Sequence, residues 1–156
     1  MIHLKTILHP TDFSQASGYA LEMACALARD QAARVILLHV VPRPVPIGRD
    51  PLVPAFKEAH TVEDLETYRQ EVKARLERLR GEAPYARVEV LLKEGDVAGV
   101  IARTAEETAS DLIVMGSHGR SRMYQLMMGS VAAEVTRHAP CPVVTVRVPA
   151  PAKAEG

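Results

Sequence analysis

The sequence has no tryptophan and no asparagine, and it holds only two cysteines in 156 residues. Its aromatic side chains are four tyrosines and two phenylalanines. These are few on which the bases of a single-stranded nucleic acid could stack. The two cysteines, Cys25 and Cys141, are too few for a scaffold built on disulfides. Free thiols are typical of a cytoplasmic protein, and we expect that location.

The chain also lacks net charge, because 19 Lys and Arg balance 19 Asp and Glu. A broad nucleic-acid surface is usually basic, and binding to a membrane surface usually needs a polybasic segment, so neither partner is expected. No apolar run reaches the roughly 18 residues of a membrane span, and the N-terminal segment lacks the layout of a signal peptide. A charged ligand would therefore have to be held by a local arrangement of groups.

What the sequence does have is a hydrophobic content of 47%, which is enough for one domain with its own core. A chain of this length buries roughly 70% of the surface that it exposes when unfolded, so it needs no disulfide or metal to fold. We predict a single domain over residues 1–148. Residues 149–156 have too little apolar content to become ordered, and we predict that they form a frayed tail.

Five short apolar runs alternate with segments of helical periodicity, and we interpret the runs as strands at residues 6–9, 34–41, 87–92, 111–115 and 142–147. Helices are predicted from Ser14, from residue 62, from Asp96 and from Gly129. The second, fourth and fifth runs are almost continuous in Val, Ile and Leu, as in strands buried on both faces. This alternation predicts an α/β fold in which helices cover both faces of an open parallel sheet.

Ligands of open parallel sheets bind beyond the carboxyl ends of the strands, so the residues after each strand are the candidates for function. Gly116 and Gly119 follow the fourth run, and their spacing lets the backbone turn sharply and approach a ligand. Gly129 and Ser130 open the last helix, where free N–H groups and the helix dipole favour an anion. Arg120 adds a guanidinium group suited to phosphate. Together these residues predict a phosphate site, although the glycines alone are also typical of plain turns.

The spacing Gly116-x2-Gly119-x9-Gly129-Ser130 resembles the ATP-binding motif of the universal stress protein family. The resemblance extends along nearly the whole chain, through residues 7–14, 37–40, 111–119 and 141–144. It implies a Rossmann-like fold with five strands in the order 3-2-1-4-5. Because each position of the glycine motif is filled, the resemblance implies the branch of the family that binds ATP.

The resemblance also implies roles for single residues. Asp12 would bond the nucleotide at a ribose hydroxyl, and the main chain of Val40 would meet the adenine edge. A Mg²⁺ or Mn²⁺ ion would bridge phosphate oxygens, because hard cations prefer oxygen ligands. The other implied residues line the pocket, wall the ribose or surround the phosphates: Pro10, Thr11, Met115, Gly116, Gly119, Arg120, Gly129, Ser130 and Val131.

Four polar residues near the strand ends could serve either the ligand or the structure of the protein. Asp12 could cap the helix that follows it instead of binding a ligand, and Ser14 could do so equally well. His118 lies in the glycine loop and is either a donor to phosphate or a solvated loop residue. His39 lies in a predicted buried strand and is interpreted as a core histidine.

On this basis we expect a regulatory switch, in which ATP stabilises one conformation of residues 42–60 and 120–128 and a protein partner reads that state. The alternative is a slow Mg-dependent ATPase, which needs a group that positions water near the γ-phosphate, and the loop offers only His118 for this. No Walker-type phosphate loop is present, and the first strand is not followed by the signatures of receiver domains, flavodoxins or nucleotidyl-transfer enzymes. The resemblance also implies a homodimer formed through the last strand, whose apolar edge needs pairing or cover.

Overall fold

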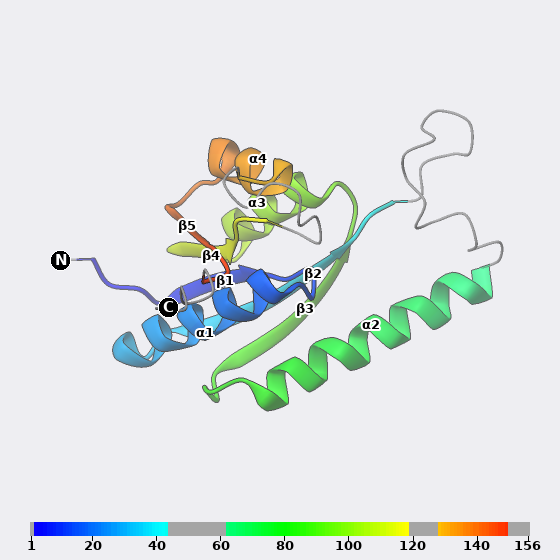
Figure 1. Ribbon diagram of the computed structural model, residues 1–156, viewed down its shortest axis with the longest axis horizontal. Coiled ribbons are helices and arrows are strands. Elements are labelled where there is room, and N and C mark those ends of the chain that lie inside the picture. The colour runs from blue at the N-terminus through cyan, green and yellow to red at the C-terminus, as the bar shows by residue number, and fades with distance from the viewer. Residues whose placement is uncertain (1, 44–61, 119–127, 150–156) are drawn as a thin grey trace, which may run out of the picture.

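The computed structural model describes residues 2–43, 62–118 and 128–149, and its strands and helices alternate along the chain (Figure 1). The strands are β1 (Thr6–Pro10), β2 (Arg34–Val41), β3 (Val88–Glu94), β4 (Leu112–Gly116) and β5 (Val143–Val146). The helices are α1 (Gln15–Gln31), α2 (Val62–Glu82), α3 (Val97–Glu107) and α4 (Ser130–His138). Each predicted element is present, with small differences at its ends. The predicted tail from residue 150 onward lies outside the described residues.

The five strands form one parallel sheet in the order β3-β2-β1-β4-β5, which confirms the predicted fold class. The register brings the carboxyl ends of the strands to the same edge. Pro10 at the end of β1 lies beside Leu38, and Gly116 at the end of β4 lies beside Val146. The segments that follow β1, β2 and β4 therefore start close together, as the alternation of strands and helices predicted.

Helices cover both faces of the sheet, with α3 and α4 above it and α1 and α2 below it in Figure 1. Alternate residues of each inner strand point to opposite faces, so the sheet supplies two separate cores. One core packs Ile7, Val35, Leu37 and Val114 against Ala24 of α1 and Leu76 of α2. The other core packs Leu8, Ile36, Leu38 and Ile113 against Ile101 of α3 and Val135 of α4.

The burial of β5 differs from the prediction. The apolar runs of β2 and β4 are buried on both faces, but Val143, Val144 and Val146 are only half-buried and Thr145 is exposed. The reason is position, because β5 pairs with β4 alone and lies at the edge of the sheet. An apolar run thus predicted the strand correctly, and its burial incorrectly.

The predicted helix caps are present where the chain leaves the sheet. Ser14 Oγ accepts a hydrogen bond from the backbone N–H of Ser17 at 3.2 Å, and Asp96 Oδ2 accepts one from Gly99 at 3.0 Å. Gly129, the cap of α4, has no side chain with which to do the same. The start of α4 therefore keeps its first N–H groups available. Over the described residues, no helix is both long and apolar enough to cross a membrane.

Candidate functional site

A cavity of about 890 Å³ opens at the edge where the strands end. Its size falls in the range typical of small-molecule sites. Of the twelve residues predicted for the site, Gly119 and Arg120 lie outside the described residues. The other ten all line this cavity: Pro10, Thr11, Asp12, Val40, Met115, Gly116, His118, Gly129, Ser130 and Val131.

The start of α4 forms one end of the cavity and is fixed by backbone hydrogen bonds. Gly129 N donates to Ser117 O at 2.7 Å, and Ser117 N donates to Val146 O at 2.9 Å, so α4 is tied to β4 and β5. The first N–H groups of an α-helix have no partner within it, and here those of Ser130 and Val131 belong to residues that line the cavity. Free N–H groups and the positive end of the helix dipole favour an anion at this end.

His118 lies beside the start of α4 and is held by its neighbour. Its Nδ1 lies 2.8 Å from Ser117 Oγ, and the side chain of Ser117 is buried. His118 is half-buried and lines the cavity, so its interpretations as a donor to phosphate and as a solvated loop residue both stay predictions. Its second nitrogen, Nε2, has no hydrogen-bond partner among the described residues.

Gly116 has a packing role that the motif did not predict. A Cβ added to this residue would lie 3.0 Å from Ala16 Cβ and 3.2 Å from both the Ala16 carbonyl carbon and Ser17 N. The missing side chain thus lets the end of β4 lie directly against the first turn of α1. Gly116 also lines the cavity, so its lack of a side chain matters both for the wall of the site and for the packing of β4 against α1.

Asp12 lies half-buried in the loop between β1 and α1, and its two carboxylate oxygens have different roles. Oδ1 accepts hydrogen bonds from Ser14 N at 2.9 Å and from Ser17 Oγ at 2.8 Å. Oδ2 has no hydrogen-bond partner among the described residues, and Asp12 lines the cavity. The interpretation of Asp12 as the helix cap is therefore wrong, because Ser14 is the cap and Asp12 braces the turn with one oxygen only. The interpretation of Asp12 as a ligand residue stays a prediction.

Phe13, which the sequence did not single out, lines the cavity and contacts Arg75 of α2. Its φ of +63° lies in the left-handed region, which bulky residues rarely adopt. The centre of its ring lies 4.8 Å from the centre of the His39 ring. The guanidinium carbon of Arg75 lies 4.1 Å from the centre of the same Phe13 ring. His39 Nδ1 donates to Thr11 O at 2.7 Å. His39 is thus buried and bonded, as predicted for a core histidine, and it also lines the cavity.

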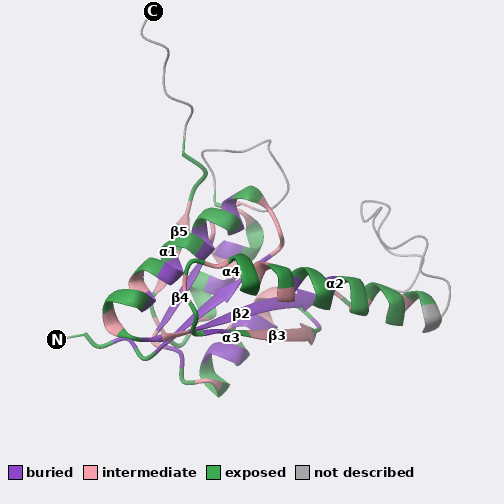
Figure 2. Cartoon of the chain, turned by 90° about the horizontal axis from the view of Figure 1, so that it is seen from below, coloured by how far each residue is buried: buried purple, intermediate pink, exposed green. Residues whose placement is uncertain are grey.

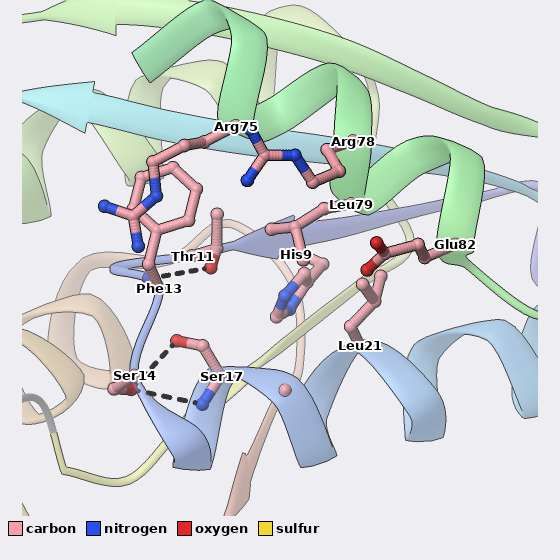
Figure 3. A pocket seen from close by; sticks show the side chains of 11 residues that line it. His9, Thr11, Phe13, Ser14, Ser17, Leu21, Arg75, Arg78, Leu79 and Glu82 are labelled. Carbon is pink, nitrogen blue, oxygen red and sulfur yellow. Dashed lines mark hydrogen bonds between the residues drawn. The ribbon is translucent and has the colours of Figure 1, made fainter. Parts of the chain in front are cut away.

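A second, smaller cavity of about 220 Å³ lies between α1 and α2 and shares part of the same wall (Figure 3). His9 lines it, is fully buried, and has its Nδ1 2.8 Å from Val114 O. Burial lowers the pKa of His9 to about 4, although the bond to Val114 O and the nearby Asp12 act against the shift. His9 is therefore neutral at pH 7 and offers no positive charge to an anion.

Several residues of the larger cavity come from α2, in which the sequence indicated no site residue. Six of its side chains line the cavity: Asp64, Leu65, Tyr68, Glu71, Val72 and Arg75. The first turns of α2 extend past the ends of the strands and are largely exposed (Figures 1 and 2). The length of α2 was the available signal, because 21 residues of helix span about 32 Å at 1.5 Å per residue, more than any strand of this sheet.

Comparison with known proteins relates this sequence and fold to one family. The model of the universal stress protein family matches residues 3–147. A universal stress protein of Thermus aquaticus is 36% identical over 152 residues, covering 92% of this chain and 98% of that protein. The universal stress protein MJ0577 of Methanocaldococcus jannaschii is 31% identical over 153 residues, covering 92% of this chain and 94% of that protein.

Solved structures share the arrangement of strands and helices. The structure of MJ0577 superposes with a TM-score of 0.77, covering 96% of this chain and all of that one, at 29% identity. A universal stress protein from Archaeoglobus fulgidus, solved in complex with dAMP, superposes with a TM-score of 0.60 at 23% identity, covering 94% of this chain and all of that one. From the family model, the sequence identity and the shared fold together, the chain belongs to the universal stress protein family.

Proposed function

We propose that this chain is an ATP-binding regulatory protein that works as a nucleotide-dependent switch. The observation that supports this most strongly is the convergence of the motif residues. Ten residues drawn from the ends of β1, β2 and β4 and from the start of α4 line one cavity, although Pro10 and Val131 are 121 positions apart in the sequence. A cavity with one polar, anion-binding end and apolar walls suits a nucleotide.

The proposed pose follows the chemistry of the walls. The phosphates lie at the start of α4, where the free N–H groups of Ser130 and Val131 face a negative charge. The ribose lies at Asp12, whose Oδ2 can accept a hydrogen bond from a hydroxyl. The adenine lies near Val40 at the end of β2, where the neighbouring cavity residues Val97 and Ile101 are apolar.

The Archaeoglobus fulgidus relative supports the ligand class, because its structure holds dAMP in the same fold. The identity to that relative is 23%, so the likeness concerns the fold. The proposal for this chain therefore stands on its own motif residues and its own cavity. The choice of a triphosphate rests on the glycine motif and on the helix start that faces the cavity.

A divalent cation fits this site through the nucleotide rather than through a cage of side chains. Among the described residues, no group of three His, Cys, Asp or Glu side chains is arranged to hold a metal ion. Mg²⁺ usually keeps several waters and binds through phosphate oxygens and one or two carboxylates. When bound in this way, Mg²⁺ or Mn²⁺ would neutralise part of the phosphate charge.

The switch is preferred to hydrolysis because hydrolysis needs a group that orients water at the γ-phosphate, and Asp12 is assigned here to the ribose. His118 Nε2, which has no hydrogen-bond partner among the described residues, is the group on which the alternative of a slow ATPase depends. The segments proposed to change conformation lie largely outside the described residues, at 44–60 and 120–127. The homodimer through β5, a protein partner that reads the bound state and the cytoplasmic location complete the proposal. The dimer is supported by the half-buried apolar edge of β5.

We expect purified protein to bind Mg-ATP with one site per chain in titration calorimetry, or to release ATP or ADP when it is denatured. Failure of both would contradict the proposed function. Incubation with labelled ATP separates the two mechanisms. Turnover no faster than in buffer supports the switch, whereas enzyme-dependent release of phosphate would replace it with the slow ATPase.

A further inference from the structure

Ser17 lies in the first turn of α1, directly behind the loop that carries Asp12. It is 5% exposed and lines both the larger cavity and the smaller one. Figure 3 shows it facing Ser14 at the start of α1, on the side of the smaller cavity. The motif that identified the other site residues does not include this serine.

The hydroxyl of Ser17 is fully used within the protein. It donates to Asp12 Oδ1 at 2.8 Å, and it accepts from Asp12 N and from Ser14 Oγ, each at 3.3 Å. A serine hydroxyl has one hydrogen to donate and two lone pairs to accept with. Ser17 therefore has no capacity left for a ligand, and any effect on a ligand must pass through Asp12.

These contacts fix the direction of the Asp12 carboxylate. Oδ1 is held by Ser17 Oγ from the helix and by Ser14 N from the turn, so the carboxylate cannot rotate without losing two hydrogen bonds to a charged group. Oδ2 is the oxygen that remains without a partner in the described part of the chain. Asp12 is thus set to present one particular oxygen to the cavity.

We infer that Ser17 is a positioning residue for the sugar, which aims Asp12 Oδ2 at a ribose hydroxyl and makes the site prefer nucleotides that carry one. This inference rests on the proposed function, in which ATP occupies the larger cavity. A carboxylate that is already oriented loses little freedom when the ligand binds, so its hydrogen bond contributes more to affinity. Removal of Ser17 Oγ frees the carboxylate and weakens that bond.

The helix itself does not depend on this hydroxyl. The cap of α1 is the bond from the backbone N–H of Ser17 to Ser14 Oγ, which alanine at position 17 would preserve. Ser14→Ala is therefore the matched control. It removes the cap and one contact to Ser17, but the bond from Ser17 Oγ to Asp12 Oδ1 and the backbone bond from Ser14 N remain.

The test measures the affinities of ATP and of 2′,3′-dideoxy-ATP, with Mg²⁺, for the wild type, Ser17→Ala and Ser14→Ala. For Ser17→Ala we expect the Kd of ATP to rise about 3- to 10-fold, the effect of one modest hydrogen bond. The Kd of the dideoxy analogue should change less than about twofold. Ser14→Ala should lower the thermal midpoint while leaving the ratio of the two affinities unchanged.

Different failures have different meanings. A wild type that binds neither nucleotide contradicts the proposed function. A wild type that binds both equally, or a Ser17→Ala variant that weakens both equally or neither, overturns the inference and leaves the proposed function standing. If Ser17→Ala does not fold, Ser17→Cys replaces it, because a thiol is a much weaker hydrogen-bond donor than a hydroxyl and holds Asp12 Oδ1 less firmly. The same loss of preference for ATP over its dideoxy analogue is then expected.

Discussion

Replacement of Gly129 by valine is expected to raise the Kd of ATP by about 100-fold or more, equivalent to about 2.7 kcal/mol. The phosphates are proposed to meet the backbone at the start of α4, and a branched side chain at its cap would occupy the same space. A bulky group there also keeps the phosphates away from the N–H groups of Ser130 and Val131. Electrostatic attraction and hydrogen bonding are therefore lost together.

The fold should tolerate this substitution. Gly129 has φ −63° and ψ 159°, an extended conformation that valine adopts readily. Its bond to the residue after β4 runs from Gly129 N to Ser117 O, and a side chain does not remove it. Circular dichroism should therefore match that of the wild type.

The matched control is Gly81→Ala in the last turn of α2. A Cβ at Gly81 meets nothing within 4 Å, and the residue does not line the larger cavity. The affinity of the Gly81→Ala variant for ATP should equal that of the wild type. If Gly129→Val also binds ATP with unchanged affinity, the phosphates do not lie at the start of α4.

Gly116→Ala is expected to lower the free energy of unfolding by about 1–3 kcal/mol. The added methyl group would lie 3.0 Å from Ala16 Cβ and 3.2 Å from backbone atoms of Ala16 and Ser17. Backbone cannot move aside as the end of a flexible side chain can, so α1 and β4 must shift apart. The shift would disturb one of the two cores as well as the wall of the cavity.

Denaturation in urea measures this change in the free energy of unfolding. The control is Gly18→Ala in α1, the helix against which Gly116 packs. A Cβ at Gly18 meets nothing within 4 Å, so alanine there should leave stability unchanged or raise it by up to about 1 kcal/mol. Equal stability of Gly116→Ala and the wild type would mean that the close approach of β4 to α1 is not needed. In that case the ligand alone would account for glycine at this position.

The fold could be predicted to a large extent because its signals are local. Apolar runs located the strands, and serine and aspartate located the caps of α1 and α3. The order of the strands was predicted from the resemblance to a family, because an apolar run does not indicate which strands lie beside it in the sheet. The burial of β5 was predicted wrongly for the same reason, because an edge strand and a central strand can have the same composition.

The site could be predicted where it follows a strand or belongs to the glycine motif. Asp12, Val40 and Gly116 lie at or just after strand ends, and parallel topology brings such positions to one edge. Ser17 and the cavity residues of α2 are placed by tertiary packing, which helical periodicity does not reveal. Phe13 is a further case, because a left-handed conformation in a phenylalanine is imposed by the turn around it and not by its own preference.

Hydrogen exchange of the backbone amides, measured with and without Mg-ATP, locates the nucleotide on the chain. The N–H groups at the start of α4 have no helical partner and should exchange quickly in the free protein. If the phosphates bind there, exchange should slow at residues 130–132 when ATP is added, while the far end of α1, at residues 24–31, should be unaffected. Saturation with ATP that leaves exchange at the start of α4 unchanged would show that the nucleotide binds elsewhere.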